Sequence, residues 1–416
     1  MNRRLTHTLQ ERVAGLRCRN CGARFPKVYL RRCPECGGLL VVQYDWELLR
    51  SAARDALGGP GIWRYWPLLP VTDPAHFVSL DEGRTPLLHA PRLGAALGLH
   101  DLWIKYEGTN PTGTFKDRSS ATAVSSALEF GFWATALVTT GNGGSAVASY
   151  SARAGLKSFI FAPTHSAQPK LHHMAACATE LVLVEGDYDA ISRTYKQLID
   201  QVEGVFDCGG LASPYKLEGK KSLAYEVAES FGWQTPDVVI CPVGTGDQFV
   251  AAWLGFEDLV RLGWIERRPR MVCVQSTVAD SIVAAWREGH ELRPRPAGRT
   301  VAEGVAIGDP GAKGEWILDI LREGDGLGVT PEDDEILAAQ RLLAKTEGLW
   351  AGPTGAIAVA GAARLARDGT LAHDARVVCI VSETGLKGEY PPLKRAATPP
   401  DLGVWQEIIT RRRGAS

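Results

Sequence analysis

Short runs of hydrophobic residues alternate along the chain with longer segments in which apolar positions recur every three or four residues. The short runs, rich in Val, Ile and Leu, are typical of buried strands, and the longer segments are typical of amphipathic helices. The predicted strands are 137–140, 158–162, 181–184, 238–242, 270–275 and 377–381, and the clearest predicted helices are 119–130, 145–154, 248–261 and 331–345. This alternation predicts an α/β fold with parallel sheets covered by helices on both faces. Ligands bind such sheets in the loops that follow the strands.

The N-terminal region lacks this alternation and instead carries two CxxC pairs separated by 11 residues. A CxxC turn can present two thiolates to one tetrahedral zinc ion, and Gly22 and Gly37 follow the pairs where the tight turn needs a permissive backbone. The predicted ligands are Cys18, Cys21, Cys33 and Cys36. Four cysteine ligands leave no open position, so this zinc is expected to be structural, and its binding would contribute about 10–16 kcal/mol to folding a small ribbon. Two redox dithiols, or a ribbon without metal, are the alternatives.

Composition indicates an ordinary globular protein. The chain has 416 residues, of which 45% are hydrophobic and 22% are charged, with a net charge of -1. These values exclude a disordered chain, and they give no reason to expect nucleic acid or an anionic membrane as a partner. No apolar run approaches the roughly 18 residues of a membrane span, and the first twelve residues are polar, without the apolar core of a signal peptide. A soluble, cytoplasmic protein is therefore expected.

The segment LWIKYEGTNPTGTFKDR at 102–118 is the most unusual in the chain. Its Asn, Pro and Gly residues fix a turn, after which Thr114, Phe115 and Lys116 precede a predicted helix. A lysine at a turn between a strand and a helix is most often solvated. The flanking hydroxyl and aromatic ring instead favour a half-buried amine, which loses its charge readily and can bond covalently to the aldehyde of a cofactor.

The sequence NPTGTFKDR at 110–118 closely resembles the cofactor-lysine motif of threonine synthases and related fold-type II pyridoxal-phosphate (PLP) enzymes. The resemblance extends from residue 79 to residue 388, and several spaced motifs in the family's order make it specific. The further motifs are DEGRTPL at 81–87, PYKLEGKKS at 214–222 and TVAEGVAIGDP at 300–310.

This resemblance implies a fold with two parallel-sheet domains and PLP between them. The large domain would comprise 45–117 and 213–416, the small domain 118–212, and the zinc ribbon 1–44. The resemblance also implies a homodimer that acts on a small amino-acid substrate.

Lys116 would carry PLP and act as the catalytic residue. The family's other cofactor contacts map onto three further motifs of this chain. The glycine-rich loop at 243–248 follows a predicted strand, and backbone N–H groups at a helix start bind anions. This loop would hold the cofactor phosphate through Gly244, Thr245, Gly246, Asp247 and Gln248. A carboxylate at Asp247 is unfavourable beside a phosphate unless its side chain points away. Asn142 would hydrogen-bond the phenolic oxygen of PLP, and Ser382 would meet its pyridine nitrogen.

The substrate contacts come from the same resemblance. The loop TTGNGGS at 139–145 would hold the substrate carboxylate, and it departs from the family at Gly143, where threonine synthases usually have threonine. Lys216 stands at the family's usual arginine position and is the candidate for the phosphate of the substrate, with Lys220 and Lys221 adding positive charge nearby. The predicted substrate-binding residues are Thr114, Thr139, Thr140, Gly143, Ser145 and Lys216. Lys387 is expected to be solvated and has no assigned role.

The implied reaction converts O-phosphohomoserine to threonine. Lys116 would act as general base at Cα and Cβ, phosphate would leave from Cγ, and water would add at Cβ. Departures at Gly143, Lys216 and AGPT at 351–354 leave two other reactions open: a cysteate synthase-like replacement of the phosphate of O-phosphoserine, and a dehydratase-like elimination from serine or threonine. A non-catalytic sensor is disfavoured because Lys116, Asn142 and Ser382 are all present.

Overall fold

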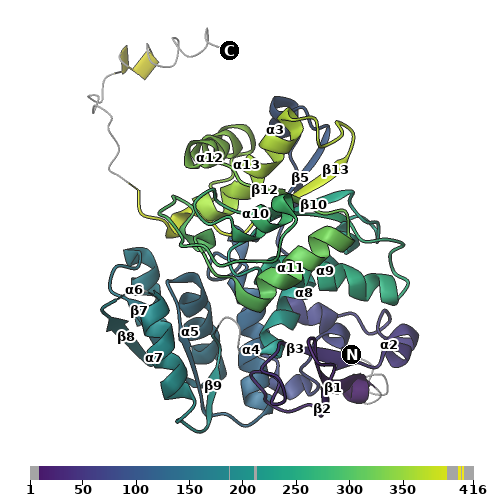
Figure 1. The fold of residues 1–416 in the computed structure, drawn as a ribbon, viewed down its shortest axis with the longest axis vertical. Helices are drawn as coiled ribbons and strands as arrows, with labels where there is room; N and C mark the ends of the chain where they lie inside the picture. The colour runs from purple at the N-terminus through teal and green to yellow at the C-terminus, as the bar shows by residue number, and fades with distance from the viewer. Residues whose placement is uncertain (1–8, 187, 210–212, 391–401, 404, 407–416) are drawn as a thin grey trace.

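The computed structural model describes residues 9–186, 188–209, 213–390, 402, 403, 405 and 406. The first eight residues and most of the residues after 390, which include the end of the expected large domain, lie outside this description. The described part contains two parallel sheets with their helices and a small antiparallel sheet near the N-terminus (Figure 1). The α/β fold predicted from the hydrophobic pattern is confirmed.

The larger sheet has six strands in the order β12-β11-β10-β13-β5-β4, and all of its pairs are parallel except β4 with β5. Helices α3, α12 and α13 pack on one face, while α8, α9, α10 and α11 pack on the other (Figure 1). The strands are β4 Leu87–His89, β5 Asp101–Tyr106, β10 Val238–Pro242, β11 Arg270–Val274, β12 Leu327–Val329 and β13 Arg376–Val381. The helices are α3 Pro91–Leu97, α8 Pro214–Ser230, α9 Asp247–Arg261, α10 Ser281–Glu288, α11 Gly311–Glu323, α12 Asp333–Glu347 and α13 Pro353–Arg367.

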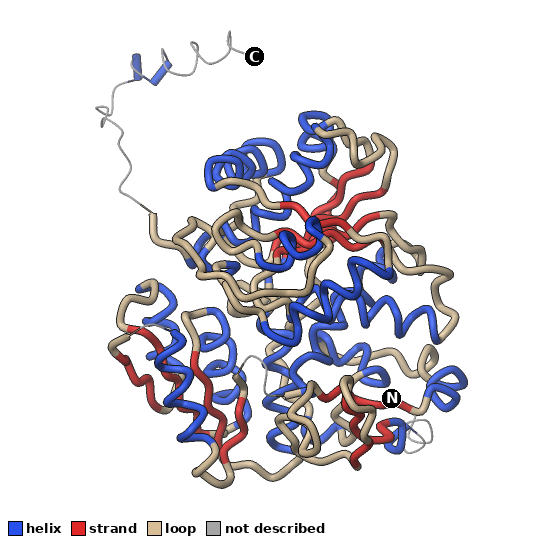
Figure 2. Tube along the Cα trace, viewed as in Figure 1, coloured by secondary structure: helices blue, strands red, loops and turns tan. Residues whose placement is uncertain are grey.

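The smaller sheet has four parallel strands in the order β8-β7-β6-β9 and lies beside the larger one, as the red strands of Figure 2 show. Helices α4, α5 and α6 share one core with this sheet, and α7 packs on its other face. The strands are β6 Ala134–Val138, β7 Lys157–Pro163, β8 Glu180–Val184 and β9 Val205–Asp207. The helices are α4 Lys116–Glu129, α5 Asn142–Ala154, α6 Gln168–Cys177 and α7 Tyr188–Ile199.

The N-terminal region forms an antiparallel sheet in the order β2-β1-β3. Its strands are β1 Val13–Cys18, β2 Arg24–Phe25 and β3 Leu40–Tyr44. Helix α2, Trp46–Ala52, and the 3-10 helices Gly61–Leu68 and Pro74–His76 continue the chain towards β4. None of the helices in the described part of the chain has the length and apolar character needed to cross a bilayer.

Each predicted strand and helix matches an observed element, but two helices begin three residues earlier than predicted. Helix α4 begins at Lys116 and α5 begins at Asn142, so each motif residue opens a helix instead of ending a loop. Strand β5 was missed because Lys105 interrupts its apolar run. In the fold Lys105 is buried, with its Nζ 2.6 Å from the Glu226 carboxylate.

Buried ion pairs connect β5, α4 and α8. The Arg118 guanidinium, fully buried on α4, contacts the carboxylate of Glu107 at 2.7 Å and that of Glu226 at 2.6 Å. It also donates to the hydroxyls of Thr85 and Ser222. Burial by itself would raise the pKa of Glu226, but Arg118 and Lys105 lower it to about 2. The two cations and two carboxylates therefore compensate one another.

We expect Arg118→Met to lower the free energy of unfolding by about 3–5 kcal/mol, because removing one partner leaves buried carboxylates uncompensated. Urea or thermal unfolding of the purified protein measures this loss. Arg261→Ala is the matched control, since the Arg261–Glu257 pair is half exposed and is expected to contribute less than about 1 kcal/mol. Equal effects of the two substitutions would contradict the central role of Arg118.

Candidate active site

Three adjacent strands of the larger sheet bring distant motifs to one edge. Strand β13 lies between β10 and β5, and the carboxyl ends of all three point the same way because the pairs are parallel. Strand β10 leads into the glycine-rich loop, β13 into Ser382, and β5 into the loop that ends at Lys116. The carboxyl ends of parallel strands are where ligands bind in such sheets.

Two hydrogen bonds fix the backbone of the loop before Lys116. The backbone N–H of Phe115 donates to the Ser382 carbonyl at 3.1 Å, and the backbone N–H of Lys116 donates to the Thr114 hydroxyl at 3.1 Å. The Lys116 amine is partly buried and lies 4.5 Å from the centre of the Phe115 ring. Burial lowers the pKa of Lys116 well below its ordinary value, and the nearby amines of Lys220 and Lys216 lower it further. A neutral, nucleophilic amine is thereby favoured at this position.

Asn142 from the smaller sheet meets the end of β13. Its side-chain amide donates to the Glu383 carboxylate at 2.5 Å, and Glu383 directly follows Ser382. Glu383 is buried, and its charge opposes the lowering of the Lys116 pKa. Lys116, Asn142 and Ser382 therefore lie on segments that contact one another. Glu383 was missed by the sequence interpretation, and the only available signal was its position just after a predicted strand.

The glycine-rich loop turns directly into α9. A Cβ at Gly244 would lie 2.8 Å from the Gly304 carbonyl oxygen, so the motif at 300–310 packs closely against this loop. Within the described residues, the backbone N–H groups of Gly244, Thr245 and Gly246 donate no hydrogen bond to the protein. The Asp247 carboxylate pairs with Lys313 and, at 3.1 Å, with Lys220. Neighbouring cations therefore compensate the Asp247 carboxylate.

The predicted substrate contacts differ in their surroundings. The Thr139 hydroxyl accepts hydrogen bonds from the N–H groups of Gly141 and Gly144, whereas Thr140 is exposed. A Cβ at Gly143 would make only ordinary contacts, the nearest at 3.4 Å, so lack of space does not explain the glycine. Lys216 is buried on α8 and donates to the Cys208 carbonyl at 2.5 Å.

The expectation of a solvated Lys387 is wrong. Lys387 is 9% exposed, and its amine donates to the Thr112 carbonyl at 2.8 Å, inside the loop that leads to Lys116. Burial lowers its pKa to about 8. Lys220 is also buried. Both side chains are covered by segments distant in the sequence.

Several buried polar atoms without a partner belong to the predicted cofactor and substrate motifs. Among the described residues, the side-chain atoms without a hydrogen bond include Asn142 Oδ1, Ser145 Oγ, Gln248 Nε2 and Ser382 Oγ. Buried polar groups are normally paired, so such a group of unpaired atoms marks a place where a ligand supplies the partners. Together with the unpaired N–H groups of residues 244–246, this arrangement fits a cofactor that carries a phosphate and a polar ring.

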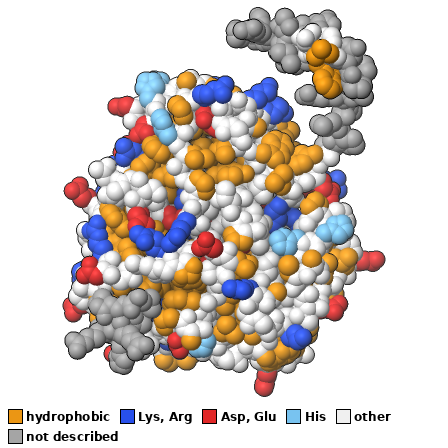
Figure 3. All heavy atoms as spheres, turned by 180° about the vertical axis from the view of Figure 1, so that it is seen from behind, with side chains coloured by type: hydrophobic (Ala, Val, Ile, Leu, Met, Phe, Trp, Pro, Cys, Tyr) orange, Lys and Arg blue, Asp and Glu red, His pale blue; other side chains and the backbone are white. Residues whose placement is uncertain are grey.

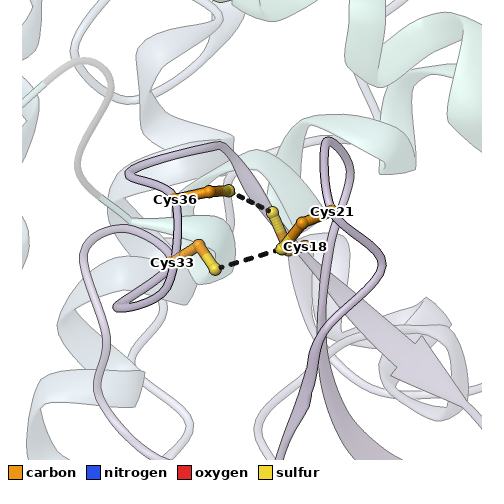
Figure 4. A group of neighbouring side chains, drawn as sticks. All are labelled: Cys18, Cys21, Cys33 and Cys36. Atoms are coloured by element: carbon orange, nitrogen blue, oxygen red, sulfur yellow. Dashed lines mark hydrogen bonds between the residues drawn. The ribbon is translucent and has the colours of Figure 1, made fainter.

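The four paired cysteines converge in the N-terminal sheet (Figure 4). All four Sγ atoms lie within 4.8 Å of one another, with Cys18 and Cys36 at 3.4 Å and Cys21 and Cys33 at 3.7 Å. Four sulfurs at about 2.3 Å from a tetrahedral zinc ion would be about 3.8 Å apart. Gly22 and Gly37 have φ values of 77° and 70°, so the permissive backbone predicted after each pair is used.

Comparison with known proteins agrees with this geometry. Residues 78–383 match the family described as pyridoxal-phosphate dependent enzyme. The chain is 34% identical over 400 residues to a threonine synthase of Methanocaldococcus jannaschii, covering 95% of this chain and 98% of that protein. It is 35% identical over 358 residues to a threonine synthase of Synechocystis, covering 84% and 89%.

Solved structures show the same fold at lower identity. Maize serine racemase aligns with a TM-score of 0.62 at 18% identity, covering 79% of this chain and 93% of that one. Threonine deaminase isoform 2 from Solanum lycopersicum aligns with a TM-score of 0.64 at 22% identity, covering 79% and 91%.

The chain therefore belongs to the family of pyridoxal-phosphate dependent enzymes. Within that family it is a threonine synthase-like lyase.

The turn before Lys116 depends on a glycine at position 113. Gly113 has a φ of 78°, and an added Cβ would lie 2.7 Å from Thr384 Cγ2. Gly155 has nearly the same φ, 71°, but open space around it. Both Gly→Ala changes strain the backbone. We expect Gly113→Ala to lower the unfolding free energy by about 1–3 kcal/mol more than Gly155→Ala, because only the former overpacks. Equal unfolding midpoints would contradict this tight contact.

Proposed function

We propose that this enzyme converts O-phosphohomoserine and water to threonine and phosphate. The main support is the convergence of Lys116, Asn142 and Ser382 from two sheets, with unpaired polar atoms around them. The long alignments with threonine synthases support the same reaction. On the face seen in Figure 3, positive and negative side chains are interspersed, in keeping with a small-molecule substrate.

In this proposal the chain holds PLP between the two sheets. Lys116 carries the cofactor, residues 244–248 bind its phosphate, and Asn142 and Ser382 contact its ring. When bound, PLP accepts electrons from the substrate, so that protons next to the amino group become acidic. The neutral hydroxyl of Ser382 at the ring nitrogen does not force that nitrogen to be protonated.

Proton transfer is assigned to Lys116. Its lowered pKa leaves the amine free to accept a proton from Cα and then one from Cβ of the substrate. Phosphate leaves from Cγ, the hydroxyl of a water molecule adds at Cβ, and protons return to Cγ and Cα. Thr139, Thr140, Gly143 and Ser145 would hold the substrate carboxylate. Lys216 would face the phosphate, with Thr114 as a secondary contact.

The holoenzyme is expected to release phosphate and threonine in equal amounts from O-phosphohomoserine. Lys116→Ala should keep bound PLP but lose the yellow absorbance of the linked cofactor, and kcat/KM should fall by at least about 10²–10⁴-fold, the contribution of a general base. Lys345→Met, which removes an exposed lysine on α12, is the control. Turnover of only O-phosphoserine, or of only unphosphorylated serine or threonine, would overturn this substrate assignment in favour of the replacement or dehydratase reaction.

We also propose one structural zinc ion at Cys18, Cys21, Cys33 and Cys36. The purified protein should contain about one zinc per chain. Cys33→Ser should lose the metal and lower the unfolding midpoint, because metal binding contributes to folding of the ribbon. Cys177→Ser, which changes a partly exposed cysteine of α6, should retain it. A full metal content in Cys33→Ser, measured by atomic emission, would rule out the four-cysteine site.

We further propose a cytoplasmic homodimer, which the family resemblance supports.

A further inference from the structure

Glu383 is fixed by two segments that are distant from it in the sequence. Its backbone forms an isolated antiparallel bridge with Thr114, in the loop that leads to Lys116. Its carbonyl accepts a hydrogen bond from the N–H of Gly352 at 3.3 Å. The residue is only 7% exposed. The backbone that carries this carboxylate is therefore held firmly beside the reaction centre.

A glycine leaves room for the Glu383 side chain. A Cβ added at Gly352 would lie 2.5 Å from the Glu383 Oε1 atom and 3.0 Å from its Cδ atom. The backbone does not require glycine at this position, because the φ of Gly352 is -68°, a value that any residue adopts. What the glycine supplies is the space that the carboxylate occupies.

The Glu383 carboxylate reaches across the junction of the two sheets. Glu383 follows β13 of the larger sheet, and Asn142 opens α5, which packs on the smaller sheet. The Asn142 Nδ2 atom donates to the Glu383 Oε2 atom at 2.5 Å. Hydrogen bonds to an ionised acceptor are roughly twice as strong as neutral ones. Among the described residues, the Asn142 Oδ1 atom is buried without a partner, so the carboxylate is what orients this amide.

The chemistry of a carboxylate selects one orientation of the Asn142 amide. A carboxylate only accepts hydrogen bonds, whereas an amide can present either its oxygen or its nitrogen. The reversed amide would set its oxygen against the oxygens of Glu383, so the nitrogen stays on that side. An amide nitrogen carries two hydrogens, and the bond to Glu383 uses one of them. The other hydrogen is available to a second acceptor.

We propose that Glu383 is a positioning residue, which holds the Asn142 amide with its nitrogen ready to donate to the phenolic oxygen of PLP. Without Glu383, the amide can turn over and present its oxygen to the phenolic oxygen, which is unfavourable. The same contact joins the smaller sheet to the larger one at the cofactor. This inference rests on the proposed function for the contact between Asn142 and PLP.

Glu383 also acts on Lys116 through its charge. Burial and the amines of Lys220 and Lys216 lower the pKa of Lys116, and the charge of Glu383 opposes this shift. This effect depends on the charge of the side chain, whereas the orientation of Asn142 depends on an acceptor at the right reach. Substitutions that change one property and keep the other therefore separate the two effects.

The test measures PLP dissociation from the holoenzyme by equilibrium dialysis, and the pH at which the absorbance of the linked cofactor changes. Asn142→Ala should weaken PLP binding by about 10–150-fold, the effect of losing a hydrogen bond to a charged group. Glu383→Ala should weaken it by about 2–10-fold, because one orienting hydrogen bond is lost. Glu383→Gln keeps an acceptor oxygen and should retain most of the affinity. Its pH midpoint should fall, because a negative charge that favours the protonated nitrogen is gone.

A double-mutant cycle separates positioning from general stabilisation. If Glu383 acts through Asn142, the double variant Asn142→Ala and Glu383→Ala should bind PLP no more weakly than Asn142→Ala alone. Gly352→Ala tests the same contact with Glu383 retained. Its new Cβ should displace the carboxylate and weaken PLP binding as Glu383→Ala does, with no further loss when the two are combined. Glu315→Gln, which removes an exposed charge on α11, is the control and should change neither readout.

Two results would overturn the positioning role: additive losses of PLP affinity in the double variant, or unchanged PLP affinity in both Glu383→Ala and Gly352→Ala. Either result, together with threonine formation from O-phosphohomoserine, would leave the proposed function standing. Non-additive losses in an enzyme that does not turn over O-phosphohomoserine would support the role of Glu383 and refute the proposed function.

Discussion

The Arg118 guanidinium, held between the buried carboxylates of Glu107 and Glu226, fixes the frame on which the active site is built. Glu107 belongs to the turn after β5, Arg118 to the first turn of α4, and Glu226 to α8. Glu107 also accepts a hydrogen bond from the Asn110 amide, whose oxygen accepts the N–H of Gly83. The motifs at 81–87 and 110–118 are thus joined by hydrogen bonds beneath the loop that presents Lys116. Because removing either kind of charge would leave the other buried and unpaired, the arrangement tolerates little displacement.

Helix α8 places further buried charged residues at the centre of the molecule. Every residue from 214 to 228 is buried, although the segment includes three lysines and two glutamates. Near Glu226 and Lys221 the charges are balanced by neighbours, and the helix acts as a structural element. Lys216 and Lys220 lie on the same helix near Lys116, and their amines lower its pKa. Helix α8 therefore contributes both to the buried ion pairs and to the electrostatics around Lys116.

The N-terminal ribbon is attached to both sheets and is not an isolated appendage. Tyr29 packs on Phe132 and Phe206 beside the smaller sheet, with ring centres 4.8 and 4.6 Å apart. On the other side, Arg19 pairs with Asp319 of α11, and the Tyr44 hydroxyl donates to Glu218 of α8 at 2.8 Å. A bound metal would therefore stabilise more than the cysteine loops, because the ribbon spans the junction of the two layers that enclose the site.

The sequence by itself determined the parallel α/β fold and the cysteine cluster, because hydrophobic periodicity and local spacing encode strands, turns and paired ligands. The motifs that carry Lys116, Asn142, the glycine-rich loop and Ser382 were found through their resemblance to those of a known family. Tertiary structure alone decided which of the charged side chains are buried. Lys105, Lys220 and Lys387 look solvated in their local sequence, and Glu383 has no local signal, yet all four are buried. Lys105, Lys387 and Glu383 contact residues more than a hundred positions away, and Lys220 pairs with Asp247 of α9. Burial and charge pairing depend on the packing of whole elements, which no local pattern specifies.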